Sequence, residues 1–287
     1  MISSLFSLQM TILSTVFTNK ELKIRNIWWV VIFFLVISAF LFPLIFLADY
    51  YGFEITIWQQ AIIILTATAI CQLLRRRPQT EWIGKIDFLW FKELFIGLMI
   101  GTALMIMPAI ILTGFGYIHW QVNNFSFSVI TSGIALMAGV ALAEELLFRG
   151  FIFQRLIDDF GKWPAQLIIA GLFLLTHLNN PGMTGTIKVL AFINIFIASI
   201  LFGISFIKTN RLAMPLGLHF MANFVQGTVL GFGVSGERES SLLTPLFNTN
   251  MQWLTGGVFG LEASIPGLAF LILITIALHF WNKSKTR

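Results

Sequence analysis

Long apolar stretches recur along the whole chain, and short polar segments separate them. Each stretch is about 20 residues long, the length of helix that crosses the hydrocarbon core of a bilayer. We therefore expect an all-α, polytopic transmembrane helix bundle with about eight spans. The predicted spans are residues 27–48, 56–74, 94–116, 129–157, 163–180, 186–207, 212–233 and 264–281.

The composition agrees with a membrane environment. The chain has 287 residues, of which 57% are hydrophobic and 11% are charged. A soluble domain has about 25% charged residues. We expect one integral, multi-pass membrane domain over residues 1–287, with lipid as its surroundings. Apolar residues within 1–26 predict a separate interfacial helix at the N-terminus.

The basic residues predict the orientation of the bundle. With eight spans and both termini in the cytoplasm, all but two of the 18 Lys and Arg residues face the cytoplasm; the exceptions are Lys188 and Arg238. This segregation follows the positive-inside rule, and it places the connection 234–263 outside. The net charge of +5 is thus explained by topology and lipid head groups, with no nucleic-acid partner. In a bacterium, the location would be the cytoplasmic (inner) membrane.

Three short polar patterns interrupt the apolar spans. Ionisable groups at membrane depth cost free energy unless they are paired or hydrated, so they are candidates for function by default. The patterns are Glu144-Glu145-x-x-x-Arg149, Phe173-x-x-x-His177 and His219-x-x-x-Asn223.

The two adjacent acids have different surroundings along the helix. Glu145 and Arg149 are four residues apart, share a helix face and can pair. That pair could simply mark the inner end of a span, with Arg149 reaching the interface. Glu144 points about 100° away from Glu145, so Arg149 cannot readily neutralise both acids. A buried carboxylate of this kind is typical of a general base or acid.

The histidine patterns are weaker when each is taken alone. A single histidine such as His177 is often an interfacial residue, and His219 with Asn223 could only bridge helices. A hairpin that turns near 160–161 would place Glu144 and His177 at the same level, about 24 Å from the turn. We therefore expect these groups to converge in one polar site, in the inner half of the membrane.

Together the three patterns resemble the CPBP family of intramembrane proteases, which includes the type II CAAX prenyl endopeptidases. The resemblance covers about residues 135–227, the expected protease core. It implies that Glu144 activates water for attack on a peptide carbonyl and that His177 helps to orient this water. His219 and Asn223 would support the water or donate hydrogen bonds to the oxyanion.

The resemblance also assigns supporting roles and a substrate class. Glu145 and Arg149 would brace the site, and Phe173 belongs to the second motif. The substrate would be a membrane-associated protein or peptide, as in CAAX processing or the processing of bacteriocins and other peptides.

Several alternatives stay open at this level. Glu144, His177 and His219 could bind zinc and leave one position for water, or Glu144 could act as the base without metal. A catalytically inactive immunity or scaffold protein could share the fold. An ion or proton transporter could use the same acids and histidines as a relay, although the inverted repeats common in transporters are not visible in the sequence.

Overall fold

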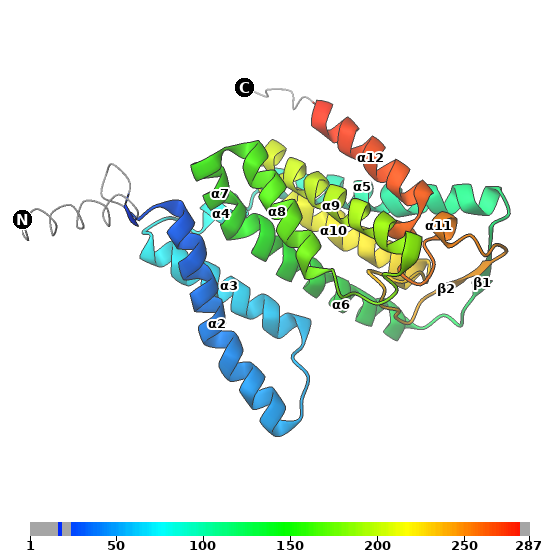
Figure 1. Ribbon diagram of the computed structural model, residues 1–287, viewed down its shortest axis with the longest axis horizontal. Coiled ribbons are helices and arrows are strands. Elements are labelled where there is room, and N and C mark those ends of the chain that lie inside the picture. The colour runs from blue at the N-terminus through cyan, green and yellow to red at the C-terminus, as the bar shows by residue number, and fades with distance from the viewer. Residues whose placement is uncertain (1–16, 19–23, 282–287) are drawn as a thin grey trace, which may run out of the picture.

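Helices dominate the computed structural model, which describes residues 17–18 and 24–281 (Figure 1). The interfacial helix expected within residues 1–26 falls almost wholly outside the described residues. The main helical elements are α2 Asn26–Tyr51, α3 Ile57–Leu74, α5 Phe88–Gly114, α6 Phe127–Glu145, η1 Leu146–Ile152, α7 Phe153–Phe160, α8 Lys162–Thr176, α9 Gly185–Thr209, α10 Ala213–Asn223, η2 Phe224–Val229 and α12 Ile265–Phe280.

Every predicted span coincides with a helix. Within the described part of the chain, five helical segments are long and apolar enough to cross a membrane: 26–51, 57–74, 88–114, 127–160 and 185–209. The helices 162–176 and 265–280 are apolar but shorter, and α10 continues into η2 without a break. The protein is therefore an integral, multi-pass membrane protein, while eight spans and the orientation of the termini stay predictions.

The fold is not purely helical. Strand β1 (Ile118–Val122) pairs antiparallel with β2 (Leu243–Phe247) at one end of the bundle (Figure 1). Two short helical turns, α11 (Gln252–Thr255) and η3 (Leu261–Ala263), lie in the same region, and α4 (Thr80–Ile83) joins α3 to α5. The two strands occur in connections between spans, where backbone groups need partners that a helix does not supply.

Small residues allow α5 and α10 to pack backbone against backbone. A side chain at Gly97 would place its Cβ 2.3 Å from the carbonyl oxygen of Met214, and one at Gly217 would lie 2.4 Å from that of Leu94. Close contacts of this kind are typical of membrane helices, which associate through packing more than through hydrophobic burial. Helix α10, which carries the third motif, is therefore fixed against α5.

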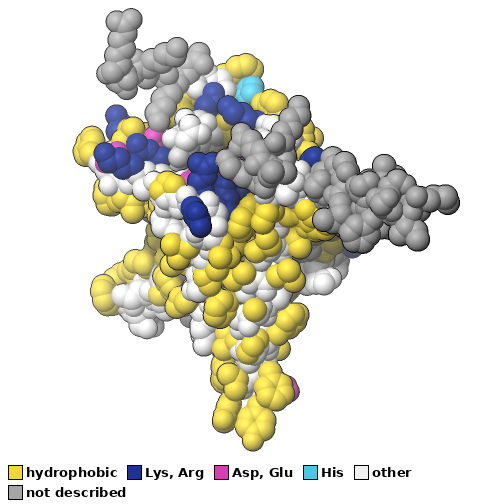
Figure 2. Space-filling view, turned by 90° about the vertical axis from the view of Figure 1, so that its left-hand side faces the viewer, with side chains coloured by type: hydrophobic (Ala, Val, Ile, Leu, Met, Phe, Trp, Pro, Cys, Tyr) yellow, Lys and Arg dark blue, Asp and Glu magenta, His cyan; other side chains and the backbone are white. Residues whose placement is uncertain are grey.

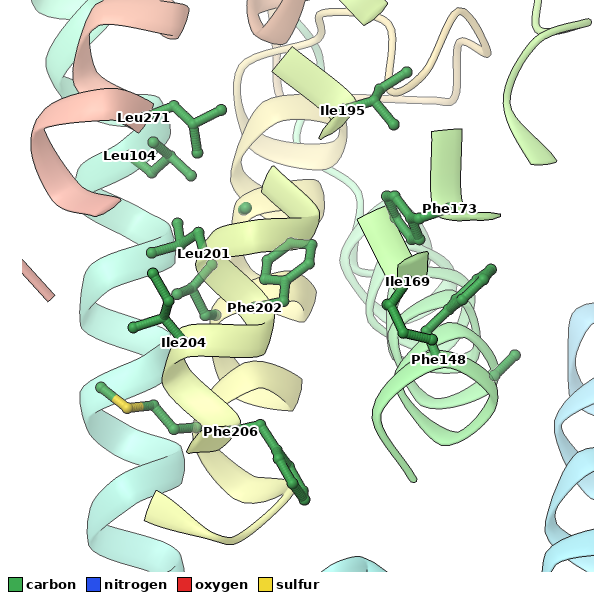
Figure 3. Packing of buried hydrophobic residues seen from close by; sticks show 14 of the residues in the cluster. Leu104, Phe148, Ile169, Phe173, Ile195, Leu201, Phe202, Ile204, Phe206 and Leu271 are labelled. Carbon is green, nitrogen blue, oxygen red and sulfur yellow. The ribbon is translucent and has the colours of Figure 1, made fainter. Parts of the chain in front are cut away.

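Aromatic residues fill the core between η1, α8 and α9 (Figure 3). The ring centroids of Phe148 and Phe173 are 5.0 Å apart, and those of Phe173 and Phe202 are 6.4 Å apart. Both pairs pack edge to face, an arrangement that aromatic quadrupoles favour. The polar residues Arg149 and His219 pack against the rings of this cluster.

Basic side chains gather at the end of the molecule that is turned toward the viewer in Figure 2, next to a broad apolar surface. At this end the carboxylate of Glu81 in α4 binds Arg75, which follows α3, and Arg155 of α7. Helices α2 and α3 project from the bundle as a hairpin (Figure 1), and apolar α2 residues such as Phe42 and Phe46 are exposed. Both features suit a lipid environment with polar ends.

Candidate active site

The structure brings five of the seven sequence-predicted site residues to one cavity of about 350 Å³. Its walls come from α6, from the end of α8, from α9 and α10, and from the connection between η2 and α12. Among the motif residues, those that line the cavity are Glu144, Phe173, His177, His219 and Asn223. Glu145 and Arg149 do not line the cavity; both are fully buried, and Glu145 contacts His219 on the side away from Glu144.

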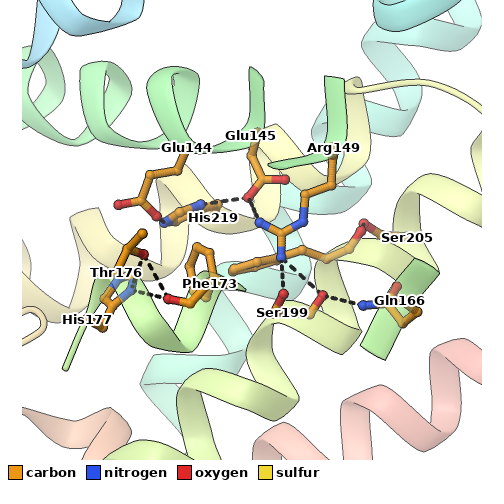
Figure 4. A network of polar contacts seen from close by, with 11 residues as sticks. Glu144, Glu145, Arg149, Gln166, Phe173, Thr176, His177, Ser199, Ser205 and His219 are labelled. Atoms are coloured by element: carbon orange, nitrogen blue, oxygen red, sulfur yellow. Dashed lines mark hydrogen bonds and ion pairs between the residues drawn. The ribbon is translucent and has the colours of Figure 1, made fainter. Parts of the chain in front are cut away.

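The His219 imidazole lies between the two adjacent glutamates (Figure 4). Its Nδ1 is 2.9 Å from Oε1 of Glu145, and its Nε2 is 3.7 Å from Oε2 of Glu144. The ring stacks on Phe202 with a centroid distance of 4.7 Å and an interplanar angle of 12°. His219 is therefore held in one orientation, with Nε2 directed toward Glu144.

Glu145 also anchors a fully buried arginine. Arg149 Nη1 donates to Oε1 of Glu145 at 3.1 Å, and Nη2 donates to the carbonyl and the hydroxyl of Ser199 (Figure 4). The guanidinium lies over the rings of Phe173 and Phe202, at 4.9 and 5.1 Å from their centroids. The predicted Glu145–Arg149 pair is thus present, but it is a buried link between helices and not a pair at the membrane interface.

His177 occupies the residue position immediately after α8. Its Nδ1 lies 2.7 Å from the carbonyl oxygen of Phe173 and 3.1 Å from Oγ1 of Thr176. Because a carbonyl oxygen only accepts, Nδ1 carries the proton in that contact, and Nε2 is left for a water or a substrate. Thr176, which the sequence did not single out, lines the cavity as well.

Two π-helical segments begin directly after motif residues. Segment η1 starts after Glu145, and η2 starts after Asn223. Such segments occur frequently at functional sites, because the extra residue in the turn changes which side chains face a neighbouring helix. The pattern of side chains does not reveal them in the sequence.

The position of the cavity bears on the expected depth of the site. Glu144 and His177 line the same cavity, and α7 and α8 turn at Gly161 as the hairpin argument expects. However, α8 ends at Thr176, so His177 lies at the end of its helix. Five residues of the connection that was predicted to be outside complete the wall: Val234, Ser235, Glu237, Glu239 and Glu262. With that connection outside, as the basic residues predict, the site would extend beyond the inner half of the bundle.

Glu144, His177 and His219, the expected zinc ligands, do not form a ready group of three ligands in the described part of the structure. Zinc sites use three or four protein ligands around the ion. In the described part of the chain, no group of three His, Cys, Asp or Glu side chains is arranged to hold a metal. The Nδ1 atoms of His219 and His177 contact Glu145 and the Phe173 carbonyl, which leaves Nε2 of each ring for another partner. The side chains alone can carry the proposed chemistry, with Glu144 as the base.

Comparison with known proteins agrees with the motifs. Residues 126–225 match the family model described as type II CAAX prenyl endopeptidase Rce1-like. No curated protein matches the chain. The matched segment contains all three motifs and most of the cavity wall. Over this segment, the chain is similar to the Rce1-like type II CAAX prenyl endopeptidases, the family relationship that its motifs predict.

Proposed function

We propose that this protein is an intramembrane endopeptidase that hydrolyses a peptide bond of a membrane-associated protein or peptide. One observation carries the proposal. Oε2 of Glu144 is buried in the cavity, and among the described residues it has no hydrogen-bond partner. A buried acceptor is costly unless something satisfies it, and a water molecule between Glu144 and a substrate carbonyl would do so.

The surrounding groups supply the other parts of amide hydrolysis. Glu144 takes a proton from the water as the water oxygen attacks the carbonyl carbon. His177, His219 and Asn223 line the same cavity and are suited to orient the water or to donate to the oxyanion that forms. The proton held by Glu144 then passes to the leaving amine, and the carboxylate is restored.

Glu145 and Arg149 act behind these groups. Glu145 fixes the His219 ring through Nδ1, and Arg149 fixes Glu145. A catalytic group that is held by a second layer of contacts does not need to reorganise during the reaction, which lowers the barrier. In this arrangement Glu144 acts as the base, and Glu145 supports the site by holding His219.

The family match and the membrane setting support one class of substrate. The type II CAAX prenyl endopeptidase match favours a lipid-modified or membrane-bound polypeptide. A CAAX-type protein, a bacteriocin precursor or another membrane peptide would each satisfy this chemistry. A comparison of the membrane peptides from cells with and without the active protein would identify which of these substrates is cleaved.

The test compares membrane peptides from cells that carry the native protein, Glu144→Gln or Glu54→Gln. Gln is nearly isosteric with Glu but cannot accept the proton, so products should fall by more than about 100-fold if Glu144 is the general base. Glu54 is an exposed acid between α2 and α3 and serves as the matched control. Identical peptides from native and Glu144→Gln membranes would favour an inactive scaffold protein.

A further inference from the structure

A tight turn at the cavity wall has an unusual backbone. Val234 and Glu237 exchange two backbone hydrogen bonds, of 2.8 and 3.0 Å. The two residues between them, Ser235 and Gly236, have φ angles of 50° and 92°. Turns with positive φ at both central positions favour Gly or Asn, and a serine in this region is strained. Such strain persists only where the surroundings hold it, and it is frequent at functional sites.

A carboxylate from a later part of the chain holds this turn. Oε1 of Glu262 accepts hydrogen bonds from the backbone nitrogen of Ser235 at 2.5 Å and from its hydroxyl at 3.2 Å. Burial raises the pKa of Glu262, while the Ser235 hydrogen bonds, the nearby His177 and Gln226 oppose this rise. Glu262 and Ser235 both line the cavity, so the hydrogen bonds lie in its wall.

The turn is packed against the chain that follows His177. A Cβ atom at Gly236 would lie 2.0 Å from the carbonyl oxygen of Pro181, and one at Gly182 would lie 3.1 Å from the backbone nitrogen of Phe259. The backbone nitrogen of Gly236 donates to the Phe259 carbonyl at 2.9 Å. The segments around 181, 236 and 259 therefore leave no space between them, and a shift of the turn moves the chain beside His177.

The same wall is tied to the helix that carries His219 and Asn223. Gln226 of η2 donates to the carbonyl oxygen of Gly233 at 2.7 Å, and its Nε2 would lie 2.9 Å from a Cβ atom at Gly260. The side chain of Gln226 is almost fully buried. The wall therefore connects the second motif with the third through contacts that the motifs themselves do not contain.

We propose that Glu262 is a positioning residue of this site: by accepting from Ser235 it fixes the 234–237 turn and thereby the spacing between His177 and the His219–Asn223 helix. This inference rests on the proposed proteolysis. It adds a residue outside the matched segment 126–225 and assigns a purpose to the strained turn. The role of Glu262 is that of a hydrogen-bond acceptor and not of a proton carrier.

The acceptor role predicts a specific pattern of rescue. Glu262→Ala removes the acceptor, and a displacement of about 1 Å at the reacting groups can lower the rate by about 100-fold. Glu262→Gln keeps an oxygen that can accept from Ser235, so it should retain most of the activity. The loss in Glu262→Ala should appear in kcat, with KM changed little, because the turn positions the reacting groups more than it binds the substrate.

The experiment uses the full-length protein and the peptide set that depends on Glu144. Product formation is measured for native protein, Glu262→Ala, Glu262→Gln and the control Glu54→Gln, with thermal melting in detergent to verify folding. kcat and KM are then measured on the most abundant peptide of that set. We expect Glu262→Ala to lose at least about tenfold in kcat, and Glu262→Gln and Glu54→Gln to remain near the native value.

Each outcome supports or overturns a defined statement. Native kcat in a folded Glu262→Ala protein would overturn the positioning role and leave the proteolysis intact. Equal losses in Glu262→Ala and Glu262→Gln would also overturn it, because the charge and not the acceptor would then matter. If Glu262→Ala does not fold, Glu262→Asp replaces it: its shorter side chain draws the carboxylate away from Ser235, so kcat should fall, and a native kcat would overturn the positioning role. Absence of any Glu144-dependent peptide would overturn the proposed function itself.

Discussion

Nδ1 of His219 lies 2.9 Å from Oε1 of Glu145, so the second acid of the Glu144–Glu145 pair holds the histidine. The same oxygen accepts from Arg149. One carboxylate thus links α6 to α10 and, through Arg149, to Ser199 of α9. Glu144 does not make these contacts and faces the cavity. Because the two adjacent acids differ in this way, replacing each by its amide should have different effects.

Glu145→Gln should destabilise the protein more than Glu144→Gln does. The substitution leaves Arg149 as a fully buried cation without its counter-charge, and breaking such a pair costs about 3–5 kcal/mol. Glu144 has no hydrogen-bond partner at Oε2 among the described residues, so its amide should fold nearly as well as the native protein. Thermal melting in detergent measures both. A larger loss for Glu144→Gln would show that the assignment of the two acids is reversed.

Metal removal should leave the activity unchanged. In the proposed mechanism Glu144 is the general base and needs no metal to take a proton from water. Protein purified with chelator should cleave the Glu144-dependent peptides at the native rate and contain well under one equivalent of zinc by elemental analysis. A stoichiometric metal content together with activity that chelator abolishes and zinc restores would assign the reaction to a metal centre with rearranged histidines.

The termini and the cavity wall should lie on opposite sides of the membrane. Basic residues predict a cytoplasmic C-terminus and an external 234–263 connection, and Ser235 and Glu262 of that connection line the cavity. Reporter fusions after Arg287 and within 234–263 should therefore give opposite signals, and the site would be reached from the outside. Signals from the same side would disprove the eight-span arrangement.

Local geometry explains what the sequence could predict. Apolar stretches mark the helices, and residues four apart share a helix face, so the Glu145–Arg149 pair and the helix at each predicted span were predictable. The turn at Gly161 also made it predictable that Glu144 and His177 would face one cavity. All of these depend on distances along one helix or one hairpin.

Contacts between distant segments explain what could not be predicted. His219 and Glu145 are 74 positions apart, and their contact depends on how α10 packs against α6. The π-helical segments arise from tertiary packing, because no residue type is specific to them. Glu262 has no motif around it and reaches the site only because its connection folds back over the end of α8.

The ion pair between Asp87 and Arg211, at the basic end of the bundle, should contribute to stability in a pH-dependent way. Asp87 caps α5 by accepting from the backbone nitrogen of Trp90 and binds Arg211, which precedes α10. Arg211 donates hydrogen bonds that lower the pKa of Asp87. A lowered pKa in the folded state means that the stabilisation is complete above the unfolded pKa of about 3.9 and disappears as the pH falls below it.

Asp87→Asn should therefore melt at a lower temperature than native protein near neutral pH, and the difference should shrink between about pH 5 and pH 3. Glu54→Gln is the control and should show no such convergence. A constant difference at every pH would mean that the charge of the Asp87 carboxylate, and with it the Arg211 pair, does not contribute to stability.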